Sequence, residues 1–383
     1  MFDLKHQMIL QVLPALNQGG VERGTIDIAE GIIKAGGKAL VISAGGKLEP
    51  QLKKIGAEHI RLPLNSKNPF TICLNFLRLR KFIREKKVAL VHARSRGPAW
   101  SAYWAARSLK IPFITTFHGT YNFRNNGKKY YNSVMARGDQ VIAISKFIQE
   151  HIEKKYKNYI TPNKIKIIYR GVDLDYFDPQ NVTKERSESL KKAWGLDKNG
   201  TLILMVGRLV RWKGQAILLE ALNKMKDFKG CCVILGSSQG HEQYLNELQA
   251  YVNKNSLTDK VKFIEQCQDM PTAYSLATAV VHASTAPEAF GRVIAEAQAM
   301  GKFVIASKLG APEEIIENEK TGLLVAPSDS LTLKQALETA VTFSPAKRKE
   351  ISIEARKRVQ NLFSKKVMIQ ETLRIYTEFL QKK

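Results

Sequence analysis

Cysteines are few in this sequence, and their placement argues against a disulfide framework. Four occur among 383 residues, at Cys73, Cys231, Cys232 and Cys267. None forms a CxxC pair or lies beside clustered histidines, as structural zinc sites and disulfide-rich scaffolds require. We therefore expect buried, reduced thiols in a cytoplasmic protein.

Long apolar runs and two common sequence signatures are also missing. No stretch approaches the ~20 apolar residues of a membrane-spanning helix, and the run Met8–Leu13 is too short for a signal-peptide core. We therefore expect a protein that is soluble or lies on a membrane surface. The GxGxxG spacing is absent, which disfavours an NAD-dependent oxidoreductase. No helix-turn-helix or RNP-like signature supports nucleic-acid binding.

Acidic residues are scarce relative to basic ones. The chain has 60 Lys and Arg against 35 Asp and Glu, a net charge of +25. Residues 1–183 hold 30 basic and 13 acidic residues, a net charge of +17. The positive electrostatic potential of such a domain would attract an anionic membrane or nucleic acid. A lysine-rich proteome would explain part of the total charge but not its asymmetry.

What the sequence does contain is an alternation of short β-branched runs with helical patterns, which is typical of parallel sheets built from βαβ units. In the first half it predicts strands at 8–13, 38–43, 88–93, 112–117 and 140–144, and helices at 21–35, 69–86, 98–109 and 146–155. The alternation restarts at Thr201, with strands at 201–206, 231–235, 261–264, 279–283 and 303–306, and helices at 214–226, 241–255, 271–277 and 291–300.

Length and alternation together predict an α/β protein of two Rossmann-like, doubly wound domains. We place the first domain over 1–180 and the second over 181–365. Between the two series, residues 170–200 contain RGVDLDYFDP and a polar, charged stretch, which predicts a hinge. The tail 346–381 reads as helical with no strand after it, so it must pack on something already built.

The segment LNQGGVERG (Leu16–Gly24) directly follows the first predicted strand. Gly19 and Gly20 permit a tight turn and a close approach of backbone to a ligand. A helix that opens at Val21 would present its N-terminus to an anion. A tight βα turn without a ligand would look the same, so both interpretations stay open.

The segment VGRLVRWKG (206–214) ends the first strand of the second series. Gly207 precedes Arg208, and Lys213 follows five residues later, in the loop where open α/β sheets bind ligands. A guanidinium fork and an ammonium point charge suit a diphosphate. Two loop cations are usually only solvated, but the strand end and the glycine favour a site.

The segment APEAFGRVIAEAQAMG (286–301) is the most specific pattern. Glu288 precedes a predicted helix and Glu296 lies two turns into it. Between them, backbone N–H groups at 291–293 form a helix start that can receive a phosphate. The two carboxylates could bind sugar and ribose hydroxyls. Two glutamates at this spacing also occur by chance, but the flanking Pro, Gly and apolar strand make the whole pattern specific.

Two further signals concern a histidine and a pair of aspartates. In TTFHGTY (115–121), His118 closes a predicted strand; a lone histidine is usually structural, but the strand-end position favours a site role. The DxD spacing of Asp173 and Asp175 matches metal-dependent transferases. It falls in the predicted hinge rather than at a strand end, so we expect no metal ligand there.

The four motifs at 16–24, 115–121, 206–214 and 286–301 occur in an order that resembles the GT-B glycosyltransferases of family four, a retaining group that uses nucleotide-sugar donors. The resemblance extends over nearly the whole chain. The resemblance implies two domains facing a cleft, with a C-terminal helix (366–383) that returns to the first domain. No cofactor is expected. The implied partners are a nucleotide-sugar donor and a glycan or glycolipid acceptor, and not nucleic acid.

The resemblance also implies roles for individual residues. Arg208 and Lys213 would bind the diphosphate. Glu288 and His118 would contact the transferred sugar. These two residues, with Arg208 and Lys213, are the catalytic residues that the resemblance implies. The remaining donor-binding residues that it implies are Gly19, Gly20, Gly207, Phe290, Gly291, Arg292, Val293 and Glu296, with Glu296 on the ribose and Gly20 near the phosphates or the acceptor.

Two stretches, 91–107 and 131–145, resemble the subgroup that acts in bacterial lipopolysaccharide-core synthesis. The chain departs from the family at Ala289, where Gly is frequent, and this leaves the donor sugar open. It departs again at Arg170, where Asn is common. A nucleotide-sugar epimerase of the same fold, which would use the donor pocket without an acceptor, is the alternative function; a basic nucleic-acid-binding protein is a weaker one.

The basic first domain contains two segments that suit an anionic interface. With the subgroup resemblance, they predict a lipid-linked or lipopolysaccharide acceptor met at the inner face of the cytoplasmic membrane. The helical segment could instead pack on the sheet, with its cations as the solvated face, and both interpretations stay open. The segments are FLRLRKFIREKK (76–87), with Phe76, Leu79, Phe82 and Ile83 on one face, and YNFRNNGKKYY (121–131), with Arg124, Lys128 and Lys129.

Overall fold

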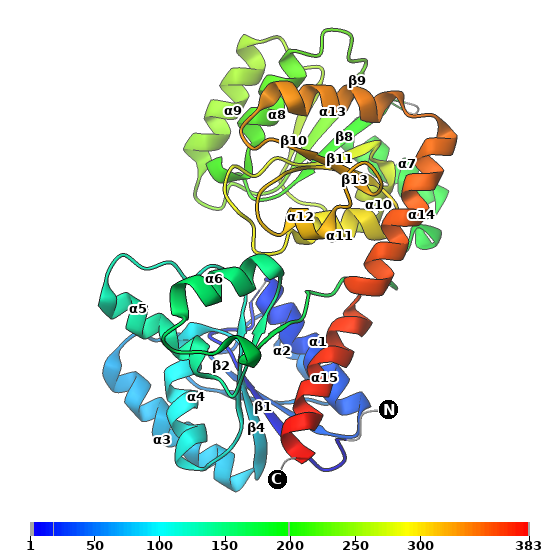
Figure 1. The fold of residues 1–383 in the computed structure, drawn as a ribbon. Coiled ribbons are helices and arrows are strands. Elements are labelled where there is room, and N and C mark those ends of the chain that lie inside the picture. The colour runs from blue at the N-terminus through cyan, green and yellow to red at the C-terminus, as the bar shows by residue number, and fades with distance from the viewer. Residues whose placement is uncertain (1–3, 18, 198–199, 382–383) are drawn as a thin grey trace. The chain divides into compact units, whose positions relative to one another are not determined.

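The computed structural model describes residues 4–17, 19–197 and 200–381. Contacts divide the chain into two units, Met1–Gly171 with Lys365–Lys383, and Val172–Ser364. Each unit is a parallel sheet with helices packed around it (Figure 1). The predicted α/β class with two Rossmann-like domains is confirmed. Along the chain, the first change of unit falls after Gly171, somewhat before the predicted 180/181.

Unit 1 is built on a seven-stranded sheet in the order β3-β2-β1-β4-β5-β6-β7. The apolar runs predicted five of its strands; β3 and β7 were missed because both are short strands at the sheet's edges with few buried side chains. The strands are β1 Met8–Val12, β2 Lys38–Ser43, β3 Glu58–Arg61, β4 Val88–Ala93, β5 Phe113–Phe117, β6 Gln140–Ala143 and β7 Ile165–Ile167. The helices are α1 Gly20–Lys34, α2 Glu49–Lys54, α3 Pro69–Glu85, α4 Arg96–Ser108, α5 Asn126–Ser133, α6 Lys146–Tyr156 and α15 Lys365–Gln381.

Unit 2 is built on a six-stranded sheet in the order β10-β9-β8-β11-β12-β13, of which only β13 was not predicted. The strands are β8 Thr201–Val206, β9 Gly230–Leu235, β10 Val261–Ile264, β11 Ala279–His282, β12 Phe303–Ser307 and β13 Gly322–Val325. The helices are α7 Lys184–Trp194, α8 Gln215–Asn223, α9 Glu242–Lys254, α10 Met270–Leu276, α11 Arg292–Ala299, α12 Pro312–Ile315, α13 Ser330–Thr342 and α14 Pro345–Leu362.

The predicted hinge over 170–200 is wrong for much of its length, because α7 occupies its second half. Thr183 caps this helix by accepting a hydrogen bond from the Arg186 amide, and Gly195 ends it in a left-handed conformation. The helix packs on α10, and the ion pair between Arg186 and Asp269, 2.6 Å long, reinforces the contact. Only Trp194 of α7 is buried, so apolar periodicity could not reveal the helix.

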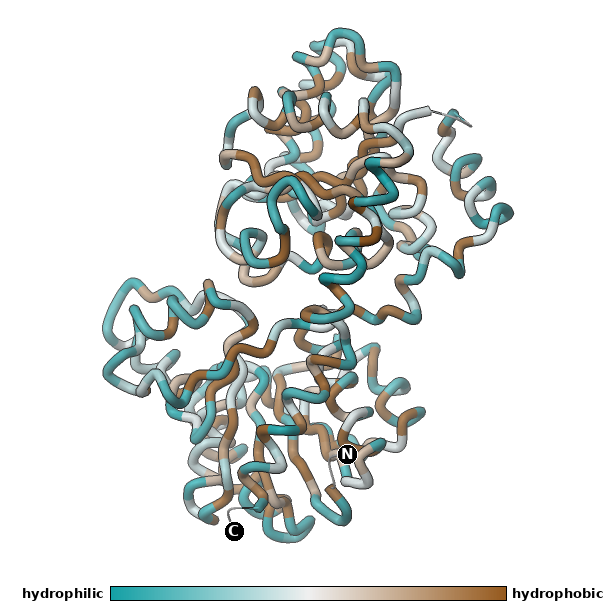
Figure 2. The backbone as a smooth tube through the Cα atoms, turned by 45° about the vertical axis from the view of Figure 1, so that its right-hand side comes forward, coloured by the Kyte–Doolittle hydropathy of each residue, from teal (hydrophilic) through white to brown (hydrophobic). Residues whose placement is uncertain are grey.

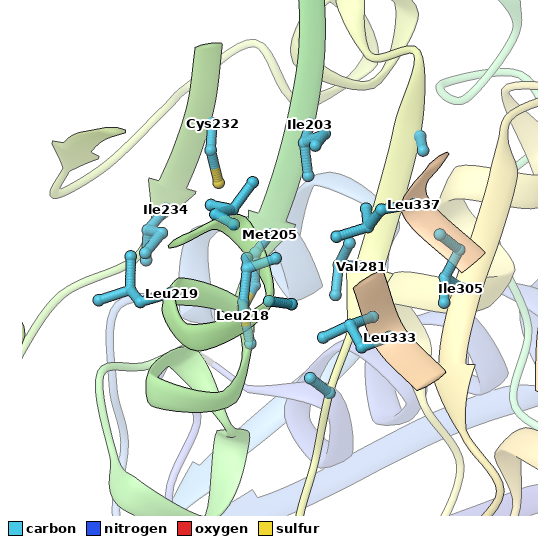
Figure 3. Packing of buried hydrophobic residues seen from close by; sticks show 14 of the residues in the cluster. Ile203, Met205, Leu218, Leu219, Cys232, Ile234, Val281, Ile305, Leu333 and Leu337 are labelled. Carbon is cyan, nitrogen blue, oxygen red and sulfur yellow. The ribbon is translucent and has the colours of Figure 1, made fainter. Parts of the chain in front are cut away.

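Both cores form where apolar strands meet apolar helix faces, and the hydropathy colouring traces them along the strands (Figure 2). In unit 2, strand side chains such as Ile203, Met205 and Cys232 pack against Leu218 of α8 and Leu337 of α13 (Figure 3). The expectation of buried thiols holds for Cys232 only, because the other three cysteines are partly or fully exposed.

The tail 346–381 is helical, as predicted, and forms two helices separated by Phe363 and Ser364. Helix α14 belongs to unit 2, whereas α15 belongs to unit 1 and packs on α1. Ile369 fits directly above Gly31, where a Cβ would lie 2.4 Å from its methyl group. The hydroxyl of Tyr376 lies 2.6 Å from Nδ1 of the buried His92. The expected return of the last helix to the first domain is confirmed.

We predict that Tyr376→Ala lowers the free energy of unfolding of unit 1 by about 3–5 kcal/mol, because the change leaves a cavity in the core and removes the partner of His92 Nδ1. Urea unfolding followed by fluorescence measures the loss. Arg374→Ala, on the exposed side of the same helix, is the control and should change stability by less than about 0.5 kcal/mol. Equal stability of the two variants would show that α15 is not integral to unit 1.

Candidate functional site

The predicted site residues gather at one edge of each sheet. All strands in both sheets are parallel, so their carboxyl ends meet at a common edge, where open α/β sheets bind ligands. In unit 1 this edge carries the loop after β1 with Gly20, and His118 after β5. In unit 2 it carries Arg208 after β8 and Glu288 after β11. We describe the two edges separately.

The carboxylate of Glu288 is the centre of the unit 2 edge. Its Oε1 accepts a hydrogen bond from Lys213 Nζ. The same oxygen accepts a second hydrogen bond from Ser284 Oγ at 3.0 Å and lies 3.0 Å from Nε2 of His282. The Lys213 ammonium also stacks on the Trp212 ring at 4.5 Å. The structure thus joins two residues that the sequence placed in separate motifs, Lys213 and Glu288.

All hydrogen bonds described for the Glu288 carboxylate reach Oε1, so Oε2 remains to accept from a ligand hydroxyl. Burial by itself would raise the pKa of Glu288. Hydrogen bonding and charge at His282 and Lys213 outweigh burial and hold the pKa well below its ordinary value of 4.5. This residue is therefore an ionised acceptor at neutral pH, and it is not suited to give up a proton.

Close backbone approaches position Lys213. Gly214 has a φ of 80°, and a Cβ there would lie 1.8 Å from the carbonyl oxygen of Ala283, the residue after β11. A Cβ on Gly236 would lie 1.9 Å from the carbonyl oxygen of Gly207. The loops after β8 and β9 can therefore lie directly on the neighbouring strand ends only because these positions are glycines.

Arg208 is an exposed cation at this edge. Its side chain borders a cavity of about 440 Å³, and its backbone carbonyl accepts a hydrogen bond from Gln215. Arg211, which lies over the Tyr244 ring and pairs with Glu247, borders the same cavity. Cations and aromatic rings together suit a phosphorylated, ring-bearing ligand. The cavity is lined by Arg208, Val210, Arg211, Trp212, Gly240, His241, Gln243 and Tyr244.

Helix α11 begins at Arg292, directly after Gly291 with a φ of 87°. Glu296 is buried, and its carboxylate accepts hydrogen bonds from the Tyr274 hydroxyl at 3.0 Å and from Arg292 at 2.8 Å. Val293 is only partly buried. The side chain of Phe290 is buried and packs on Phe363, so Phe290 could meet a ligand only through its backbone.

In unit 1, Arg170 links the start of α1 to His118. One guanidinium nitrogen of Arg170 donates to His118 Nδ1 at 2.8 Å, and another occupies the place that a Gly20 Cβ would take. Gly19 is the residue directly before α1, and Gln18 lies outside the described residues. Burial, then the charge of Arg170, lowers the pKa of His118 well below 6.5. Because Nδ1 accepts from Arg170, the proton of the neutral ring is on Nε2, which is buried and without a partner among the described residues. His118 thus presents a donor at this edge.

Sequence reasoning missed His282, Ser284 and Arg94. His282 ends an apolar strand and resembles a core residue; its only signal is that a polar residue follows "AVV" at a strand end. Arg94, after β4, is buried against the second turn of α1, where a Gly24 Cβ would lie 3.0 Å from it.

Asp173 accepts hydrogen bonds from backbone amides two and three residues on and so stabilises a turn. Among the described residues, no three His, Cys, Asp or Glu side chains gather as a metal site would require.

The geometry of two parallel Rossmann-like sheets with polar edges is that of GT-B proteins, and comparison with known sequences identifies the family. Residues 18–176 match Glycosyltransferase Family 4, and residues 186–358 match Glycosyl transferases group 1. The crystal structure of a glycosyltransferase from Rickettsia africae ESF-5 is 40% identical, with a TM-score of 0.93, over 99% of this chain and 100% of that chain. The chain belongs to these glycosyltransferases.

Two more distant structures share the fold. Anabaena HepE in complex with UDP and glucose is 23% identical, with a TM-score of 0.82, over 97% of this chain and 100% of that chain. WaaG, a glycosyltransferase involved in lipopolysaccharide biosynthesis, is 16% identical, with a TM-score of 0.72, over 96% and 99%. In the described part of the chain, no helix has the length and hydrophobicity to cross a bilayer.

We predict that ionised Glu288 stabilises unit 2 in a pH-dependent way. Its pKa is lower in the folded than in the unfolded state, so its contribution is fully present above about pH 4.5 and is lost as the pH falls towards the folded-state value. The difference in free energy of unfolding between wild type and Glu288→Gln should be constant from about pH 7 to pH 5 and shrink below. Denaturant titrations at several pH values measure it. A difference that grows on acidification would show that Glu288 is not held ionised.

Proposed function

We propose that this glycosyltransferase moves a hexose from a nucleoside-diphosphate donor to a lipid-linked or glycan acceptor of the cell envelope. The observation that supports this most is the unit 2 edge, where Lys213 contacts the ionised Glu288 and Arg208 follows β8, the strand next to β11. Cations suit the diphosphate, and a carboxylate suits sugar hydroxyls. The UDP and glucose bound by Anabaena HepE support the same class of donor.

In the proposed reaction, the bond from the sugar's anomeric carbon to the diphosphate oxygen breaks, and negative charge develops on the diphosphate. Arg208, Lys213 and the N-terminus of α11 are the positive groups that would stabilise this charge. Loss of one preorganised donor of this kind typically costs 10²–10³ in rate. Lys213 would exchange part of its contact with Glu288 for a phosphate oxygen when the donor binds.

The other polar groups would hold the sugar. Glu288 Oε2 would accept from a sugar hydroxyl, and His118 Nε2–H would donate to an oxygen. Glu296 would bind the ribose, with Gly19, Gly20, Gly207 and residues 290–293 forming the backbone contacts of the donor site.

We propose retention at the anomeric carbon without a covalent sugar intermediate. A double displacement needs a basic carboxylate as nucleophile, whereas hydrogen bonds and charge at His282 and Lys213 lower the pKa of Glu288 and make it a weak nucleophile. The acceptor hydroxyl would attack from the side of the leaving diphosphate, and a phosphate oxygen would take its proton. The lipopolysaccharide core is the acceptor that the sequence resemblance favours, and a membrane-bound substrate fits the basic unit 1.

A thermal-shift panel of nucleoside diphosphates and their sugars tests the donor site. One nucleotide should raise the melting temperature, since a ligand at 100 times its dissociation constant stabilises by ≈ 2.7 kcal/mol. Arg208→Ala should abolish the shift without changing the melting temperature of the free protein, because Arg208 is exposed. Lys226→Ala is the control, because this exposed lysine lies between α8 and the start of β9, at the opposite edge of the sheet. Absence of any shift across the panel would contradict the proposal.

We predict that Arg208→Ala and Lys213→Ala each reduce turnover about 10²-fold or more at saturating donor. Lys213→Ala should also lower thermal stability, because Glu288 loses its charged partner. Near-normal turnover in both variants would remove these cations from the mechanism.

We propose that the reaction needs no divalent metal, so a chelator should leave the rate unchanged. Loss of activity that Mg²⁺ or Mn²⁺ restores would contradict this and direct attention to Asp173 and Asp175.

A further inference from the structure

Helix α3 carries apolar residues on two opposite faces. The face that the sequence assigns either to a membrane or to the sheet packs inside unit 1: Leu79 and Ile83 are buried, and Phe76 and Phe82 are partly buried. Helix α4 covers this face, and the Ser101 hydroxyl donates to the α3 carbonyl of Ile72 at 2.8 Å. Of the two interpretations that the sequence leaves open for this face, the structure therefore favours packing inside unit 1.

The opposite face exposes three large apolar side chains. Phe70, Leu74 and Leu77 are 82%, 50% and 53% exposed. Their spacing of four and three residues places them on one stripe of the helix, roughly 180° from Leu79. The helix that presents them is capped, because Asn68 accepts a hydrogen bond from the Phe70 amide. We call Phe70, Leu74 and Leu77 the α3 stripe. It is an exposed apolar surface on a helix whose other face packs on α4.

The same stripe becomes basic further along the helix. Lys81 and Arg84 continue it, and Arg78 and Arg80 flank it; all four are exposed. Glu85 is the one acidic residue within α3, and it pairs with Lys81 at 3.9 Å. Apolar residues followed by cations on one helix face suit an anionic bilayer, where side chains enter the interface and cations meet the head groups.

The direction of α3 places the apolar end of the stripe near the proposed site. The helix leads into β4, whose carboxyl end, like those of β1 and β5, belongs to the edge that carries Gly20 and His118. Since a helix in a βαβ unit runs opposite to its strands, the N-terminal end of α3 lies towards this edge. The loop before α3 confirms this, because the carbonyl oxygen of Leu64 lies 3.2 Å from where a Gly97 Cβ would be, at the start of α4.

We propose that the α3 stripe docks unit 1 on an anionic lipid bilayer, with Phe70, Leu74 and Leu77 inserted and the cations on the head groups. The inference rests on the proposed function, because docking would bring this edge to a lipid-linked acceptor. Charge complementarity selects the bilayer over an apolar protein surface: four cations border the three apolar side chains, and unit 1 carries most of the net charge of the chain.

Co-sedimentation with vesicles tests the proposal on the full chain. Wild type should bind vesicles containing phosphatidylglycerol at low salt, bind less as salt rises, and bind neutral phosphatidylcholine vesicles weakly. Phe70→Glu with Leu77→Glu should reduce the bound fraction at least tenfold. The matched control, Leu331→Glu with Ile353→Glu, changes apolar residues of unit 2 that are 57% and 55% exposed and should bind as wild type.

Three outcomes would overturn the proposal. Wild type could fail to bind anionic vesicles at low salt, or both double variants could lose binding equally. Alternatively, wild type could be a dimer in size-exclusion chromatography that Phe70→Glu with Leu77→Glu converts to a monomer, which would assign the stripe to a second copy of the chain. The nucleotide-induced thermal shift separates this test from the donor site, because the Phe70 and Leu77 variant should keep the shift even when it has lost vesicle binding.

Discussion

The chemistry proposed for unit 2 depends on one buried carboxylate that must stay ionised. Removing Glu288 from water is unfavourable unless donors compensate its charge, and Lys213, Ser284 and His282 do so from two different strand ends. The same contacts fix the distance between the loop after β8 and the loop before α11. One ionic interaction therefore supports both local stability and the arrangement of the candidate donor site.

In unit 1, the polar side chain at the sheet edge is held by a cation rather than being itself a carboxylate. Arg170 stands where the family commonly has Asn, and its guanidinium reaches both His118 and the backbone at Gly20. Burial and the contacting cation keep His118 neutral, and the hydrogen bond from that cation determines which nitrogen carries the proton. The departure from the family pattern at Arg170 thus defines His118 as a hydrogen-bond donor rather than a base.

Apolar runs predicted the buried strands well, because a strand covered on both faces has a continuous hydrophobic sequence. They could not reveal the edge strands β3 and β7, which have few buried side chains, or α7, whose only buried residue is Trp194. For the site, strand-end position predicted Lys213 and Glu288 but not their contact, which depends on the close approach that Gly214 permits. Periodicity also failed to orient α3, since a helix that is apolar on two faces gives the same pattern whichever face is buried.

In the proposed reaction, the donor's bond to diphosphate breaks and its sugar moves to another molecule. Phosphorus NMR of the nucleotide sugar selected by thermal shift, mixed with wild type and acceptor-bearing membrane vesicles, tests this most directly. We expect the signals of the diphosphate diester to be replaced by those of a free nucleoside diphosphate, and we expect Lys213→Ala to slow this change about 10²-fold. A donor whose diphosphate diester persists while its sugar isomerises would contradict the account and identify an epimerase.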